Sequence, residues 1–294
     1  MKLTLKGDTM KTLEEIKAIF RESEDEIKDK FWELIKSNNL EAVKEFLKDY
    51  PIPEIFFEKW FQNSWTRKVQ LEPFFPSPLV LAHAGLAYEK DKSFAMIEYF
   101  ESLGLKADDQ YDWWNALSGY IDWGGKNPKV IEYFLGKGAT FETYTEYGNT
   151  PIHNWALFGK PKKLEVALKA GANIEMKSIK TDNELRVGWN HIDATPLYEA
   201  VTDDERVASC TGILLKYGAE VNAVHCSLND DGTWFAIRSI LDVAYGGKNK
   251  KLLKEAGAKT WKQLVKEYNI DTSLELSEQY RIYNELLEKK KKAK

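Results

Sequence analysis

The sequence has few of the features of a secreted or membrane-spanning protein. Its 294 residues include only two cysteines, Cys210 and Cys226, which are too few for a disulfide framework and favour a reducing compartment. No apolar run reaches the roughly 18 residues of a membrane span, and no basic and apolar leader opens the chain. We therefore expect a cytoplasmic protein.

The charge balance disfavours a nucleic-acid partner. The formal net charge is −4, and the tail at 289–294 alone carries five lysines, so the rest of the chain is more acidic than the total suggests. Generic nucleic-acid binding draws most of its free energy from neutralised phosphates, which an acidic body does not supply. We interpret the tail as a solvated helix end. We expect neither nucleic-acid nor membrane partners.

One short phrase recurs along the chain. It reads SPLVLA at 77–82, TPIHNWA at 150–156 and TPLYEA at 195–200. A second signal is a glycine that is followed by alanine in four of its five copies. The five glycines are Gly104, Gly138, Gly171, Gly218 and Gly257. The first two steps between these glycines are 34 and 33 residues. A fixed period of this length indicates stacked supersecondary units, and such arrays present long binding surfaces.

The unit that begins near residue 148 shows the expected anatomy. Thr150 is a suitable N-cap, and Pro151 has its φ preset for the first helical position. The apolar residues of 152–156 have helical spacing, which predicts that Trp155 lies in the core. A break at 159–161 precedes a second apolar helix, which Gly171 ends. Each unit is therefore predicted to be a helical hairpin.

With these residues the chain resembles ankyrin-repeat proteins. The match covers TPIHNWA at 150–156 and the endings GANIE at 171–175 and GAEVN at 218–222. The resemblance implies an all-α solenoid of about six or seven helical hairpins, in which His153 forms a structural hydrogen bond with Thr150. We expect an N-terminal segment and capping helix at 1–30, repeats at 31–259 that are irregular at 51–74, and a helical cap with a Lys-rich tail at 260–294. In the cap, apolar positions fall at helical spacing at Leu276, Tyr280, Tyr283 and Leu287.

Two units are longer than the period. Thr150 to Thr195 is 45 residues and Thr195 to Ser239 is 44, against the 33 of the family's repeat. The glycine stops place most of the excess at 176–192 and 223–238, between hairpins. The resemblance implies that these are finger loops that line the concave face. Because loop closure costs little free energy as length grows, we expect both fingers to vary freely without disturbing the fold.

Aromatic residues recur in successive fingers, usually beside a charged residue. Such residues are enriched at interface hot spots, so we predict a partner-binding row. It comprises Tyr111, Trp113, Tyr144, Tyr147, Arg186, Trp189, His191, Trp234, Phe235 and Arg238. Two alternatives stay open: the rings pack between fingers and stiffen them, or they line a small-ligand pocket.

Catalytic and metal-binding patterns are weak. The glycine-rich stretches 123–126 and 246–249 lack the remainder of a phosphate-loop pattern and are predicted to be turns within hairpins. His191, His225 and Cys226 are possible zinc ligands only if the two long fingers meet, and adjacent ligands are poor geometry for one metal. We expect no catalytic residues, no metal and no cofactor.

The sequence thus favours a monomeric, non-catalytic module that binds a protein partner of unknown identity through its finger face. One alternative is an inhibitor or immunity-type protein that occludes a single target. Another is an enzyme or small-ligand binder with a site between the two long fingers.

Overall fold

The structure of the chain is a computed structural model that describes residues 27, 29–50, 77–110, 114–145, 147–179, 191–202, 208–229 and 233–292. Within these ranges most residues are helical, and three strands form one small sheet. The expectation of a mainly helical protein is therefore confirmed. Most of the expected N-terminal segment and the irregular stretch at 51–74 lie outside the described residues.

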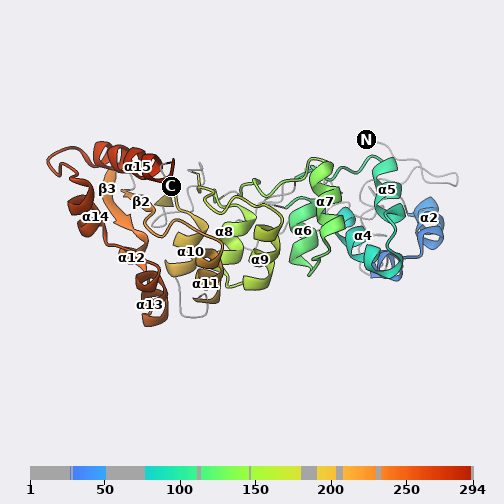
Figure 1. Cartoon of the computed structure of the whole chain (residues 1–294). Helices are drawn as coiled ribbons and strands as arrows, with labels where there is room; N and C mark the ends of the chain where they lie inside the picture. The colour runs from blue at the N-terminus through green and yellow to red at the C-terminus, as the bar shows by residue number, and fades with distance from the viewer. Residues whose placement is uncertain are drawn as a thin grey trace.

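Ten of the described helices form five antiparallel pairs that follow one another along the chain (Figure 1). The pairs are α4 (Ser77–Asp91) with α5 (Ala95–Ser102), α6 (Ala116–Asp122) with α7 (Pro128–Gly136), α8 (Pro151–Leu157) with α9 (Pro161–Lys169), α10 (Pro196–Thr202) with α11 (Ala208–Lys216), and α12 (Ile240–Val243) with α13 (Gly247–Glu255). A helical stretch at 29–37 and α2 (Leu40–Asp49) precede them, and α14 (Trp261–Tyr268) and α15 (Leu276–Lys292) follow. The molecule is an elongated row.

The pairs are stacked in two layers of helices. In the first layer α4 contacts α6, and α10 contacts both α8 and α12. In the second layer α11 contacts both α9 and α13. Small side chains are buried along the first layer, at Ala82, Ala116, Ala156, Ala200 and, directly after α12, Ala244. A single hairpin leaves its apolar face in water, so each pair depends on its neighbours for a continuous core.

At α6 and α8, each the first helix of its pair, side-chain caps fix the residue at which the helix begins. Asn115 and Ser118 cap α6 reciprocally, each side chain bonding the other's backbone N–H at 3.0 Å. At α8, the backbone N–H and the hydroxyl of Thr150 lie 3.2 and 2.7 Å from His153 Nδ1. Nδ1 therefore accepts, and the ring proton on Nε2 is donated to the carbonyl of Ala194 at 2.9 Å. The expected Thr150–His153 hydrogen bond is confirmed.

The prediction that the two glycine-rich stretches are turns is confirmed for 123–126, which joins α6 to α7 and has Gly124 at φ 92°. The stretch at 246–249 contributes only Gly246, at φ 75°, to the turn between α12 and α13, because α13 begins at Gly247. Side chains rarely adopt such backbone angles, so glycine relieves strain at both turns.

Trp155 is buried in the core, as its spacing predicts, with 2% of its surface exposed. Its ring N–H donates to Asp122 Oδ1 at 2.9 Å, and Lys163 Nζ donates to the same oxygen at 2.6 Å. Trp155 thus joins the α8–α9 pair to the end of α6.

A second, smaller core lies at the C-terminal end of the row. It forms between α14, α15 and the strands β2 (Val224–Leu228) and β3 (Trp234–Ser239), and the third strand is β1 (His191–Ile192). Val224, Ile237, Leu264, Tyr283 and Leu287 are buried there. The predicted apolar face of 276–287 is confirmed, because Leu276 and Tyr280 also pack against this core. No helix in the described part of the chain has both the length and the apolar character needed to cross a bilayer.

Candidate functional site

The finger segments, which connect one helix pair to the next, lie along one side of the row (Figure 1). They are 103–115, 137–150, 170–195, 217–239 and 256–260, apart from the residues outside the described ranges. Because every pair is antiparallel, the turns within the pairs lie at the opposite end of the helices. The described parts of the finger segments therefore lie along one edge of the molecule.

Hydrogen bonds tie each finger segment to the next. Asn115 Nδ2 donates to the carbonyl of Thr140 at 2.6 Å, which joins the first segment to the second. The Tyr144 hydroxyl donates to the carbonyl of Lys177 at 3.3 Å, which joins the second to the third. The row is held by specific contacts along its length and presents a preformed surface.

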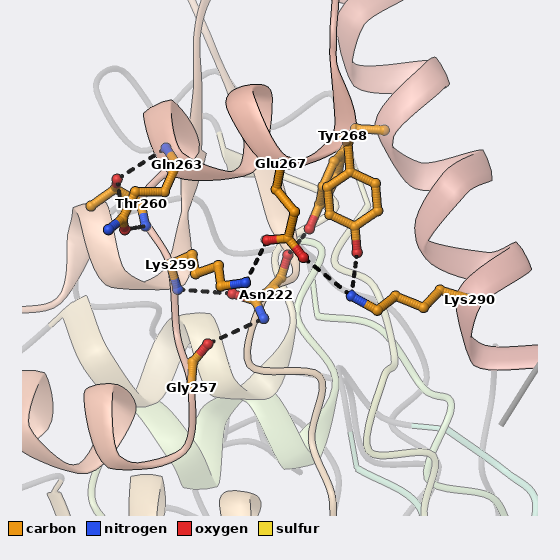
Figure 2. Close-up of polar contacts among 9 residues, drawn as sticks. Asn222, Gly257, Lys259, Thr260, Gln263, Glu267, Tyr268 and Lys290 are labelled. Carbon is orange, nitrogen blue, oxygen red and sulfur yellow. Dashed lines mark hydrogen bonds and ion pairs between the residues drawn. The ribbon is translucent and has the colours of Figure 1, made fainter.

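The same linkage continues through Asn222 to the C-terminal helices (Figure 2). Asn222 Oδ1 accepts from the backbone N–H of Lys259 at 2.8 Å, and its backbone carbonyl accepts from the Tyr283 hydroxyl at 2.7 Å. Lys259 also pairs with Glu267, whose second oxygen lies 3.4 Å from Lys290 Nζ. These contacts fasten α15 to the last finger segments.

The two long finger segments pair with each other in one sheet of order β1-β2-β3. Residues of β1 pair antiparallel with β2, His191 with Ser227, and β2 pairs antiparallel with β3, His225 with Arg238. The expectation that both segments are finger loops is corrected, because their ends pair as strands of one sheet against which α14 and α15 pack. Burial of Val224 and Ile237 on this face supplies the apolar area that a two-strand ribbon lacks.

A polar junction joins the first long segment, 170–195, to α15. The Tyr280 hydroxyl donates to Asp193 Oδ2 at 2.7 Å, and Lys177 Nζ donates to the Asp193 carbonyl at 3.3 Å. Asp193 has φ 63°, an uncommon angle for a residue other than glycine. Burial and the hydrogen bond to Asp193 raise the pKa of the Tyr280 hydroxyl, while burial lowers the pKa of the Lys177 amine.

The thiol of Cys226, on β2, is not activated as a nucleophile. Burial raises the pKa of Cys226 to about 11, so the thiol stays protonated near neutral pH and is a poor nucleophile. His225, the preceding residue, is buried with its ring 4.0 Å from that of Tyr198. Successive strand residues point to opposite faces, so His225 and Cys226 do not converge. Among the described residues no group of three His, Cys, Asp or Glu side chains is placed to hold a metal ion.

The structure places the predicted partner-binding residues in different environments. Tyr147 and Phe235 are 37% and 60% exposed, and Arg238 is exposed. Tyr144 is half-buried with its hydroxyl bonded to the third segment. Trp234 is half-buried with its ring 5.3 Å from that of Tyr280 on α15, a contact of the kind that the packing alternative predicts. Outside the described residues lie Tyr111, Trp113, Arg186 and Trp189, and the His191 side chain is likewise not described.

Two features of this edge escaped the sequence patterns. Ile179 is 42% exposed, and its backbone N–H donates to the Gly148 carbonyl at 3.0 Å, beside Tyr147. Asp193 and Lys177 form the junction with α15 although no local motif marks them. For the contact of Ile179, the sequence offered one signal, the repeat register, which places residue 179 opposite residue 148 in the neighbouring finger.

The comparisons with known proteins add no relatives to this description. No protein-family model matches the chain, and no curated protein matches it.

Proposed function

We propose that this chain is an ankyrin-like repeat solenoid and a non-catalytic module that binds a protein partner through its finger face. The observation that carries the proposal is the row of finger segments, which hydrogen bonds join from one helix pair to the next. Loops held on a rigid scaffold are where binding residues concentrate, and preformed surfaces lose less entropy on binding. In this proposal the protein acts as a cytoplasmic monomer.

The proposed contact surface consists of Tyr147, Ile179, Phe235 and Arg238. Tyr147 and Ile179 lie together because the Ile179 N–H bonds to Gly148. Phe235 and Arg238 lie on β3, farther along the row. An apolar ring left largely in water gains little from folding, so the exposure of Phe235 is better explained by binding than by stability. Arginine and aromatic residues are the side chains most enriched at interface hot spots.

The test compares partner capture by two folded variants of the full chain. Phe235→Ala combined with Arg238→Ala removes the β3 part of the surface and leaves the Trp234–Tyr280 contact in place. Phe158→Ala is the matched control, since Phe158 is 65% exposed in the turn between α8 and α9, at the end of the helices opposite the fingers. Partners captured from host extract by the unmodified chain are then titrated against all three proteins. We expect the double variant to lose at least about 2 kcal/mol of binding free energy, the hot-spot range, and the control to lose none. Equal affinities for the three proteins would refute binding through this face.

A further inference from the structure

Positive charge is concentrated on the second helices of three successive pairs, α9, α11 and α13. Together these helices have eight lysines and two glutamates. The second helices that precede them differ, because α5 has two glutamates and no lysine, and α7 has one residue of each kind. The net charge of the whole chain is −4, so this part of the second layer has a charge opposite to that of the molecule. We call the outward surface of α9, α11 and α13 the lysine face.

The lysine face is one surface because its helices are neighbours. α11 contacts both α9 and α13, and the three helices follow one another along the row (Figure 1). The finger face is formed by the segments that connect the pairs, whereas the lysine face is formed by helices of the second layer. The two surfaces are therefore distinct.

Most charges of the lysine face are not neutralised by neighbouring side chains. Lys169 on α9 and Lys216 on α11 share one carboxylate oxygen of Glu165, at 3.5 and 3.2 Å. Four further exposed lysines form no ion pair within the described part of the chain, namely Lys162, Lys248, Lys250 and Lys254. The face therefore keeps a positive potential that attracts an anionic partner.

Between α9 and α13, the outward side of α11 has small residues. The buried side of α11 is formed by Cys210, Thr211 and Leu214. Ser209 and Gly212, three positions apart, lie on the opposite side of the helix. A side chain at position 212 would meet no atom within 4 Å. The middle helix is thus open to solvent while long lysine side chains flank it.

Folding does not account for a glycine at position 212. Glycine weakens the interior of a helix relative to alanine. The φ of Gly212 is not positive, and no neighbour occupies the place of its missing side chain. What the glycine does provide is room for another backbone to approach α11 closely.

The composition of the lysine face distinguishes between anionic partners. α9, α11 and α13 contain no aromatic residue and no arginine. Single-stranded nucleic acids are bound by stacking on aromatic side chains, and arginine is the side chain whose fork matches phosphate. An anionic membrane would meet the lysines but would not use the open approach to Gly212. Carboxylates of a protein partner fit this face better, because lysine pairs with them as a point charge.

The spacing of the three helices fits an α-helix. Two helix-to-helix steps of about 8–10 Å place the axes of α9 and α13 about 16–20 Å apart. An α-helix with its side chains is about 10–12 Å wide, so it can lie along α11 with α9 on one side and α13 on the other. Carboxylates on its two flanks would then reach lysines of both helices.

We infer that the lysine face binds an α-helix of a partner protein. The helix lies along α11 with a small residue against Gly212, and its acidic side chains pair with the lysines of α9 and α13. The observation that carries the inference is the set of lysines without an ion pair, and Gly212 determines how closely the partner approaches. The inference does not depend on binding at the finger face, so the chain can hold both partners at once.

A phage library of alanine-rich helical peptides with randomised surface positions tests the inference, with the full chain as bait. Clones are selected on the unmodified chain and depleted on Gly212→Leu, which adds a large side chain to α11 without a change of charge. We expect the remaining peptides to carry Asp and Glu on both sides of a small residue, at helical spacing. An empty set, or one without acidic enrichment, would overturn the inference.

A labelled synthetic peptide from the selection is then titrated by fluorescence anisotropy. Gly212→Leu should bind it at least about tenfold more weakly, which is about 1.4 kcal/mol, and Lys162→Gln/Lys248→Gln should bind more weakly with a smaller salt dependence. The matched control is Lys126→Gln/Lys129→Gln, which removes two exposed lysines at the start of α7 and should bind normally. Equal losses for the two lysine variants would show that only net charge matters and would overturn the inference.

Gly212→Ala separates binding from folding. Its melting temperature should rise, because alanine favours the helix, while its affinity for the peptide should fall. A lower melting temperature would show that the fold needs this glycine and would remove the reason to assign it to a partner. If Gly212→Leu does not fold, the affinity of Gly212→Ala decides the outcome.

Two further titrations test the class of partner. A proline at the centre of the selected peptide should abolish binding, because proline breaks a helix, and retained affinity would show an extended segment and refute a helical partner. Poly(dT) and phosphatidylserine vesicles are titrated against the unmodified chain and Gly212→Leu. Weak binding that is equal for both proteins supports the inference. Binding that is as tight as that of the peptide, and equally sensitive to Gly212→Leu, would show a general polyanion surface and overturn it.

Discussion

Truncation of Trp155 should be among the most destabilising single changes in the repeat region. The side chain is 2% exposed in α8, and its ring N–H donates to Asp122 at the end of α6. Replacing a buried tryptophan by alanine costs about 3–5 kcal/mol, because transfer free energy is lost and a cavity remains. We expect Trp155→Ala to lie in this range.

A second substitution separates packing from hydrogen bonding. Trp155→Phe retains most of the ring but removes the N–H that reaches Asp122. Hydrogen bonds to charged acceptors contribute about 1.5–3 kcal/mol, and Asp122 keeps its ion pair with Lys163, so we expect the lower end of that range. The difference between the two variants is then the contribution of the buried ring.

The measurement is urea unfolding followed by helical circular dichroism. The matched control is Phe158→Ala, three positions along the chain and 65% exposed, which should change stability by less than about 0.5 kcal/mol. A loss below about 1 kcal/mol for Trp155→Ala, or equal losses for the two alanine variants, would refute the placement of Trp155 in the core.

Three further outcomes are expected. Far-ultraviolet circular dichroism should be dominated by helix, and a spectrum dominated by β-structure would contradict the fold. Tyr280→Phe removes the hydrogen bond to Asp193 and should cost about 1.5–3 kcal/mol, with faster hydrogen exchange in α15; unchanged exchange would mean that the contact does not hold the helix. The lowered pKa of Lys177 means that the unfolded chain binds more protons below the ordinary pKa of 10.5, so stability should rise with pH through the folded-state pKa toward that value. Lys177→Met should flatten this rise in unfolding free energy measured against pH, and an unchanged slope would exclude Lys177 as its source.

Local chemistry was enough to predict the helix pairs. Thr150 and Pro151 mark a helix start by capping and by preset φ, and Gly171 marks an end through its positive φ of 90°. Trp155, Tyr283 and Leu287 were predicted to be buried from helical spacing alone, and all three are. These features depend on interactions within a few residues, which a single sequence displays directly.

The secondary structure of the two long fingers depended on contacts between segments that are distant in the sequence. Their extra length was visible in the period, but the pairing of His191 with Ser227 joins two different fingers, and no local pattern specifies such a register. The sheet also needs α15, which covers Val224 and Ile237 from the far end of the chain. Strand pairing and its cover therefore became evident only in the tertiary structure.

The candidate binding residues illustrate the same division. Trp234 and Phe235 are adjacent aromatic residues in one finger, and composition predicts the same role for both. In the structure Trp234 packs on Tyr280, while Phe235 is 60% exposed. The sequence by itself determined that aromatic residues occur in the fingers and that helical hairpins separate them. Which ring faces the core and which faces solvent was decided by the pairing of β2 with β3 and by the docking of α15. The register of the two strands shifts between Ser227 and Leu228, so Trp234 lies on the same face as Ile237, and α15 packs against that face.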